Sequence, residues 1–200
     1  MAESNSETTS TAAAAATPVD VHSHDDYGRT VLHQACWDGR LADSNSYLDE
    51  GADIESSDNN GSTPLHYAVC FGHAALVKML LDRGANLEAT NFQGTALRMA
   101  VGRSLLEIVV LLLDRGAGIE TAAYANSTAL HLGASKRSRK VVALLLDRGS
   151  DINAYCPSEG SALHSAVAQN NYDVAVHLIA RGVSLEAVDR SGSTALHIAS

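Results

Sequence analysis

The sequence has few basic residues, few aromatic residues and no long apolar run. Its 14 Lys and Arg are outnumbered by 23 Asp and Glu, so the net charge is −9. A surface this acidic repels phosphate backbones, which argues against a general nucleic-acid binder. No apolar run approaches the roughly 18 residues that a membrane-spanning helix needs, and residues 1–20 lack the cationic start and Leu-rich centre of a secretory signal. Hydrophobic residues still make up 46%, enough to build a core.

Cysteine is also scarce. Cys36, Cys70 and Cys156 cannot all pair with one another, and none lies in a C-x-x-C motif, which is typical of free thiols in a reducing compartment. We therefore expect a cytoplasmic protein. The basic cluster at residues 136–140, KRSRK, matches a short nuclear-import pattern, so a nuclear location is the second expectation. The interpretation that we favour for this cluster is a solvated turn, and a docking point for an acidic partner is the next.

From residue 25 onward the chain repeats itself. A leucine followed by His or Arg recurs at intervals of 33, 32, 33, 33 and 33 residues, and a glycine that ends a second apolar run follows the same period. Repeats of this length are units that bury a core only by stacking on their neighbours. The leucine anchors are Leu32, Leu65, Leu97, Leu130, Leu163 and Leu196, and the glycine anchors are Gly51, Gly84, Gly116, Gly149 and Gly182.

The residues of each repeat predict two helices. Thr63 supplies an N-cap hydroxyl, and Pro64 suits the first helical position because its missing N–H has no partner there. The first helix is short and ends at a residue that can adopt the left-handed conformation, such as Gly39 or Gly72. A second helix follows, at residues 75–83 in the second repeat, and a polar turn leads to the next repeat. The Asp-Arg-Gly tripeptide that closes several second helices can form a ladder of exposed ion pairs, which contribute little.

These residues resemble the ankyrin repeat family, whose T-P-L-H-x-A motif is matched best by residues 63–68, TPLHYA. The resemblance covers residues 25–200 and implies an all-α fold: an α-solenoid of helix-turn-helix repeats with connecting hairpin fingers. Residues 1–24, rich in Ser, Thr and Ala, have too little apolar surface to fold and are predicted to be a disordered tail. The repeats are predicted at residues 25–57 (N-capping), 58–90, 91–122, 123–155 and 156–188, with a partial sixth repeat at 189–200.

The two ends of the predicted stack differ. The first repeat has Asp43 and Ser44 where the second has Leu76 and Val77, which indicates the polar exterior of an N-terminal capping repeat. The chain stops at Ser200, within the first helix of the sixth repeat. We therefore expect the parent protein to continue beyond that residue.

Nothing in the sequence assembles a nucleophile, a base and an oxyanion site, and no Gly-rich phosphate loop is present. His22 and His24 are residue types that zinc prefers, but such a hydrolase site needs further ligands and a barrel of about 250 residues. The repeated histidines lie on helices packed about 8–10 Å apart, too far to share one ion. The resemblance implies that they hydrogen-bond neighbouring turns instead. We predict no enzymatic activity, no cofactor and no metal.

The resemblance implies a protein-interaction module whose partner contacts the finger tips and the exposed ends of the first helices. Aromatic side chains suit such contacts because they are costly to leave in water. We predict a binding stripe across repeats one to four that is aromatic first and then basic. Its residues are Tyr27, Trp37, Asp38, Asn59, Phe71, Phe92, Arg103, Tyr124 and Lys136.

The predicted function is that of a non-catalytic scaffold or adaptor, a monomeric module within a longer chain. Its partner is expected to be a protein, with no binding to nucleic acid or membrane. The alternative is a regulatory or targeting N-terminal segment of a larger enzyme, channel or ubiquitin-ligase component, with the active domain after residue 200.

Overall fold

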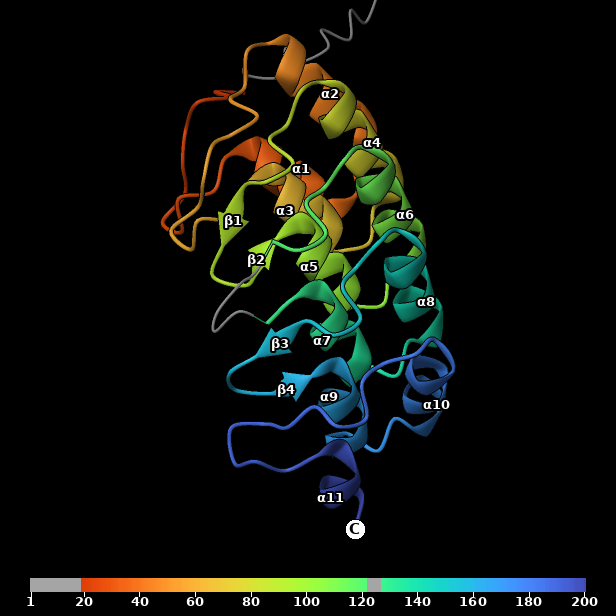
Figure 1. Cartoon of the computed structure of the whole chain (residues 1–200). Coiled ribbons are helices and arrows are strands. Elements are labelled where there is room, and N and C mark those ends of the chain that lie inside the picture. Colours follow the sequence, from red (N-terminus) through yellow and green to blue (C-terminus); the bar gives the residue numbers. More distant parts are fainter. Residues whose placement is uncertain (1–18, 122–126) are drawn as a thin grey trace, which may run out of the picture.

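The computed structural model describes residues 19–121 and 127–200 (Figure 1). Residues 1–18 of the predicted tail, and Tyr124 among the predicted partner-binding residues, lie outside the described residues. Each predicted full repeat contains one helix pair, and a single helix follows. The first helices are α1 (Val31–Asp38), α3 (Pro64–Cys70), α5 (Ala96–Gly102), α7 (Ala129–Ser135), α9 (Ala162–Ala168) and α11 (Ala195–Ala199). The second helices are α2 (Leu41–Asp49), α4 (Ala74–Asp82), α6 (Leu106–Asp114), α8 (Arg139–Asp147) and α10 (Tyr172–Ala180).

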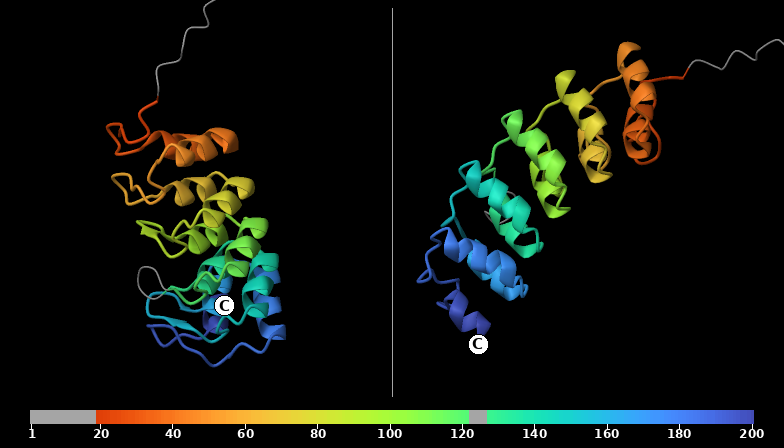
Figure 2. Two further views of the ribbon diagram at one scale, coloured as in Figure 1. Left: turned by 90° about the horizontal axis from the view of Figure 1, so that it is seen from above. Right: turned by 90° about the vertical axis from the view of Figure 1, so that its right-hand side faces the viewer.

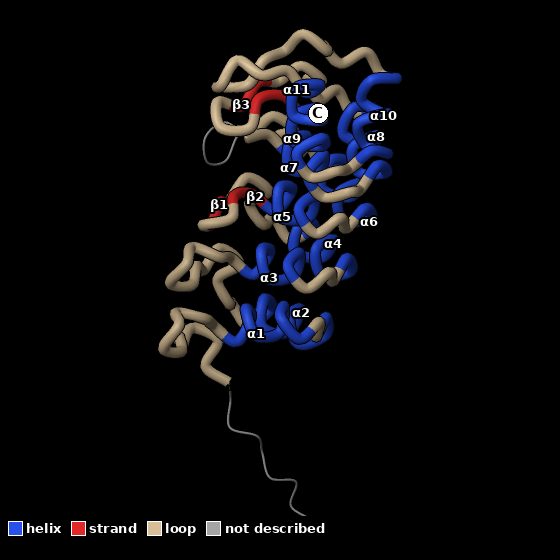
Figure 3. Tube along the Cα trace, turned by 90° about the horizontal axis from the view of Figure 1, so that it is seen from below, coloured by secondary structure: helices blue, strands red, loops and turns tan. Residues whose placement is uncertain are grey.

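The helix pairs stack into a curved array of two layers (Figure 2). First helices pack on first helices and second helices on second helices, so each pair contacts the pairs before and after it. The segments that precede the first helices project from one side of the array (Figure 3). We call these segments fingers and give each the number of the repeat whose first helix it precedes. Two of them form short antiparallel hairpins, β1 (Thr90–Asn91) with β2 (Gly94–Thr95) and β3 (Tyr155–Cys156) with β4 (Gly160–Ser161). The arrangement is the all-α solenoid with hairpin fingers that the sequence predicts.

The repeated leucine of each first helix lies at the centre of the core. In the five full repeats this residue is at most 3% exposed: Leu32, Leu65, Leu97, Leu130 and Leu163. Burying one such side chain contributes about 1.5–3 kcal/mol. The equivalent Leu196 of α11 is 76% exposed, because no further described helix pair packs on its outer side.

Each first helix except α5 begins with a Thr or Ser that is bonded to the histidine three residues later. In the first repeat the Thr30 backbone N–H donates to His33 Nδ1 at 3.1 Å, and Thr30 Oγ1 lies 2.9 Å from the same nitrogen. Because Nδ1 accepts a backbone N–H, we assign the proton of the neutral ring to Nε2. The histidine therefore satisfies a donor that the helix start leaves unpaired.

Three of these rings also bridge to the following repeat, as the family resemblance implied. Each Nε2 donates to a backbone carbonyl of the next finger, which joins two repeats through a buried side chain. The bonds run from His33 to Ser62 at 3.0 Å, from His131 to Gly160 at 3.1 Å and from His164 to Ser193 at 3.1 Å.

The third repeat departs from this pattern because it is one residue shorter and carries Arg98 in place of histidine. Arg98 Nη1 donates to the Ser127 carbonyl at 2.8 Å, so the bridge to the fourth repeat is kept. His66 faces the shortened finger and is 1% exposed, and its Nε2 has no hydrogen-bond partner among the described residues. The junction between the second and third repeats therefore lacks a buried bond that its neighbours have.

The predicted ladder of ion pairs is present between the second helices. In each rung an arginine that follows one second helix reaches an aspartate at the end of the second helix of the preceding repeat. Both side chains are partly exposed to solvent, so each pair contributes less than about 1 kcal/mol. The rungs are Arg83–Asp49 at 2.7 Å, Arg115–Asp82 at 2.9 Å, Arg148–Asp114 at 2.8 Å and Arg181–Asp147 at 2.9 Å.

One expectation for the N-terminal repeat is wrong. Ser44 is fully buried rather than on a polar exterior, and its hydroxyl donates to the Arg40 carbonyl at 2.9 Å. The serine fits the core because this local bond satisfies its hydroxyl. Asp43 does lie at the surface, in an ion pair with Arg40.

The last residues of the predicted tail pack against the repeats. Val21 is 6% exposed and belongs to the core, and His24 Nε2 lies 3.3 Å from Ser56 Oγ. The folded part of the chain therefore begins before the predicted boundary at residue 25.

The difference between the two histidine positions gives a testable prediction. His131→Ala is expected to lower the free energy of unfolding by about 1 kcal/mol more than His66→Ala, because only His131 donates to the next repeat. Both substitutions remove the same ring and the same helix cap, so each is the control for the other. Urea unfolding followed by circular dichroism measures both, and equal losses would contradict the argument.

A second prediction concerns pH. Burial lowers the pKa of His33, His66 and His131 below the ordinary value of 6.5. Below that value the unfolded chain binds more protons than the folded one, so the free energy of unfolding falls as the pH drops from about 6.5 to about 5. Urea unfolding across this range tests it. His131→Gln is expected to reduce the slope, whereas His22→Gln, at an exposed position, is expected to leave it unchanged.

Candidate functional site

Three aromatic side chains of the first two repeats lie together at the ends of α1 and α3. Trp37 stacks on Phe71 with ring centroids 4.8 Å apart and planes at 18°, and it lies 5.8 Å from Tyr67. Such pairs stabilise by about 0.5–1.5 kcal/mol beyond their burial. Trp37 and Phe71 nevertheless stay 38% and 42% exposed. The cluster therefore holds its rings in fixed positions while presenting aromatic surface to solvent.

A guanidinium extends this cluster toward the first finger. The Arg29 Cζ atom lies 4.8 Å from the ring centre of Tyr27 and 5.4 Å from that of Trp37. Asp25 fixes the guanidinium, with Oδ2 2.8 Å from Nε and 2.7 Å from Nη2. Hydrogen bonds from Arg29 hold the pKa of Asp25 below its ordinary value. Tyr27, at 65% exposure, marks the outer limit of the cluster.

A hollow of about 190 Å³ lies beside the aromatic cluster. Its lining comes from three successive repeats, through α1, α3, α5 and the second and third fingers. Phe92 enters from the turn between β1 and β2 and is 57% exposed. We call this the aromatic hollow, and it is lined by Trp37, Asp58, Asn60, Ser62, His66, Tyr67, Cys70, Phe71, Asn91, Phe92, Gln93 and Met99.

Asp58 organises the polar side of the aromatic hollow. Its Oδ1 accepts the N–H groups of Asn60 at 2.8 Å and Ser62 at 2.7 Å, and its Oδ2 accepts the Tyr67 hydroxyl at 2.8 Å. Burial alone would raise the pKa of Asp58, but these hydrogen bonds lower it below its ordinary value. Burial and the neighbouring carboxylate raise the pKa of Tyr67 to about 12, so its hydroxyl stays a donor. These bonds fix the second finger against α3.

The remaining described residues of the predicted stripe lie outside the hollow. The Nδ2 amide of Asn59 donates to the Asp26 carbonyl at 3.2 Å, which joins the second finger to the first. Asp38 is exposed and accepts a hydrogen bond from within its own helix. Arg103 Nη2 lies 3.0 Å from Cys70 Sγ, at the edge of the hollow. Lys136 is exposed at the C-cap of α7.

Of the predicted stripe, the structure brings Trp37, Phe71 and Phe92 to this hollow, which is also lined by Tyr67 and Asp58, two residues that the register did not point to. The sequence could have pointed to Tyr67, because this residue occupies the variable position of the T-P-L-H-x-A motif, on the helix that lines the hollow. The role of Asp58 depends on the second finger folding back onto a tyrosine nine residues later, which no local pattern shows.

The arrangement suits binding of an apolar or aromatic side chain. Fixed, half-exposed aromatic rings around a small hollow lose little side-chain entropy when a partner covers them. Within residues 19–121 and 127–200, no three His, Cys, Asp or Glu side chains are placed to hold a metal ion. No helix in the same ranges is long and apolar enough to cross a membrane.

Comparisons with known proteins agree with this architecture. Family models described as ankyrin repeats (3 copies) match residues 2–91 and 88–156, and a model described as ankyrin repeats (many copies) matches residues 145–199. Among solved structures, the chain is similar to the crystal structure of the human ASB11 ankyrin repeat domain. The two are 26% identical with a TM-score of 0.77, covering 86% of this chain and 77% of that one. No curated protein matches the chain significantly.

The stacking of Trp37 on Phe71 can be tested by fluorescence, because Trp37 is the only tryptophan in the sequence. Phe71→Ala is expected to expose the indole and shift its emission to longer wavelength. The matched substitution Tyr172→Ala, at an aromatic residue of α10, is expected to leave the emission unchanged. An unshifted spectrum for a folded Phe71→Ala variant would show that the two rings do not stack in solution.

Proposed function

This chain belongs to the ankyrin repeat family, and from that premise we propose that it is a non-catalytic scaffold or adaptor whose protein partner covers the aromatic hollow. Domains of this family generally mediate protein–protein interactions. The partner contacts proposed for this chain come from the finger tips and from the surface of the first helices. They include Tyr27, Trp37, Phe71 and Phe92, with Arg103 and Lys136 continuing the stripe.

The observation that carries this proposal is the aromatic hollow itself. Trp37, Phe71 and Phe92 come from three different repeats, and each keeps more than a third of its surface in water. Leaving such rings exposed costs solvation free energy that the fold does not require, whereas aromatic residues contribute strongly to binding when a partner buries them.

A second proposal treats the same repeats as a regulatory or targeting segment of a larger enzyme, channel or ubiquitin-ligase component. The observation that favours it is an uncovered apolar groove of about 490 Å³ at the C-terminal end of the array, lined in part by Val167, Ile179 and Leu196. Sequencing the transcript past codon 200 tests it: a following catalytic or channel domain favours this proposal, and a stop codon refutes it.

The interaction proposal predicts which partners are lost on mutation. A protein that the wild-type chain captures from cell lysate is expected to be lost with Phe71→Ala/Phe92→Ala, because two rings of the hollow are removed. The control is Leu41→Ala/Val176→Ala, which removes two side chains of α2 and α10 that are 39% and 66% exposed and lie outside the hollow. Both variants are first shown by circular dichroism to be folded.

Purified partner then gives the direct measurement. Titrating it into the wild-type chain is expected to change the emission of Trp37, since the indole lines the hollow. If the captured proteins are the same for the wild type and both variants, or if binding leaves Trp37 emission unaltered, the partner does not use this surface.

A further inference from the structure

The connection between α7 and α8 carries a concentration of positive charge that the rest of this acidic chain lacks. We call Lys136, Arg137, Arg139 and Lys140 the basic patch. All four are exposed. Seven other Arg and Lys residues form ion pairs with Asp, whereas no ion pair with a described carboxylate involves the basic patch. Its charge is therefore available to an incoming group.

The position of the basic patch is unfavourable for the fold alone. Arg139 and Lys140 occupy the first turn of α8, where the positive end of the helix dipole repels cations. Three other second helices carry an acidic residue in that turn: Asp43 in α2, Glu107 in α6 and Asp173 in α10. An anion bound here would offset this repulsion.

Arg137 shows that part of the basic patch is held in position. Its backbone has φ of +56°, where the first two repeats use glycine, so the side chain is retained despite a conformational cost. Its Nε donates to Asn171 Oδ1 at 2.9 Å, and Asn171 Nδ2 in turn donates to the Ala134 carbonyl at 2.8 Å. Asn171 is 4% exposed, so a buried side chain anchors the guanidinium.

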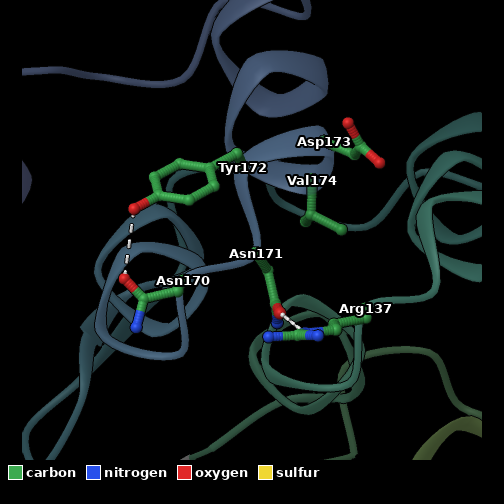
Figure 4. Close-up of a pocket in the computed structure, with 6 residues that line it drawn as sticks. All are labelled: Arg137, Asn170, Asn171, Tyr172, Asp173 and Val174. Atoms are coloured by element: carbon green, nitrogen blue, oxygen red, sulfur yellow. Dashed lines mark hydrogen bonds between the residues drawn. The ribbon is translucent and has the colours of Figure 1, made fainter.

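This anchoring leaves the two terminal nitrogens of Arg137 without a partner among the described residues. They border a hollow of about 190 Å³ formed with residues 170–174 (Figure 4). In that view the Asp173 carboxylate is turned away from the guanidinium. A guanidinium fixed through Nε presents its terminal N–H groups to one carboxylate at little entropic cost.

The basic patch continues the surface that leads from the aromatic hollow. Phe71, Arg103 and Lys136 are the C-cap residues of α3, α5 and α7, so they occupy one position in three successive repeats. Arg103 reaches Cys70, which lines the hollow. A chain lying across these helix ends meets aromatic surface first and positive charge next.

We propose that the protein partner carries an acidic segment, which docks on the basic patch while an adjacent apolar side chain fills the aromatic hollow. This inference rests on the proposed interaction function. A short run of Asp or Glu matches the patch in sign and in size. Nucleic acid or an anionic membrane would extend past four clustered cations onto a surface whose net charge is −9, and would be repelled there.

Peptide probes test the proposal. The first probe, the Glu peptide, is fluorescein-labelled and has Phe-Leu followed by six Glu. The control probe, the Gln peptide, has six Gln in place of the six Glu. Fluorescence anisotropy with the wild-type chain is expected to show binding of the Glu peptide that weakens as salt is added, with at least tenfold weaker binding of the Gln peptide. Vesicles containing phosphatidylserine and a duplex DNA of matched charge are the competing anions.

Two charge-reversal variants locate the site. Lys136→Glu/Lys140→Glu is expected to weaken binding of the Glu peptide at least tenfold. The control Lys78→Glu/Arg190→Glu makes the same change in net charge away from the patch and is expected to weaken binding less than threefold. Circular dichroism confirms that both are folded.

Several outcomes would overturn the proposal: no binding of the Glu peptide, equal binding of the Gln peptide, equal loss in both variants, or tighter binding of vesicles or DNA than of the Glu peptide. A partner that is lost with Phe71→Ala/Phe92→Ala but kept with Lys136→Glu/Lys140→Glu would leave the interaction function at the aromatic hollow standing, and would refute this inference together with the proposed contact at Lys136.

Discussion

The packing of each helix pair against the next is the constraint on which the whole structure depends. A single pair has too little apolar surface to fold alone, so the leucine at the centre of each first helix becomes buried only when neighbouring repeats are in place. The bridging histidines orient each repeat on the next, because each ring is held by the start of its own helix and donates a hydrogen bond to the finger of the following repeat. Core, caps and fingers are therefore positioned by the same repeated contact.

The period of the sequence explains why the fold could be predicted so fully. Leu, His and Gly recur at fixed positions, and each has a local physical role that needs no knowledge of distant residues. The sequence-based predictions were wrong for residues whose environment depends on contacts that the repeat pattern does not contain. Ser44 fits the core through a bond to a nearby carbonyl, and Val21 is buried by repeats that follow it. His66 keeps the pattern in sequence, but its Nε2 has no partner among the described residues.

The candidate site was predictable in part for the same reason. Register places Trp37, Phe71 and Phe92 on one side of the array, and the structure brings these three to one hollow. Register does not show that Trp37 stacks on Phe71, or that Asp58 fixes the finger through Tyr67, because those contacts depend on the spacing of repeats and on side-chain rotamers. The position of a residue within its repeat therefore predicts which side of the array it lies on, whereas the shape of the site depends on contacts between side chains.

The shortened third repeat has a mechanical consequence. The joint between the second and third repeats lacks the buried side-chain bond to the next finger that the other joints have, so it has one restraint fewer against separation under tension. The aromatic hollow spans this same joint, with Tyr67 and Phe71 on one side and Phe92 and Met99 on the other. A ligand seated there would contact the repeats on both sides of this joint and would add a restraint where the histidine bond is missing.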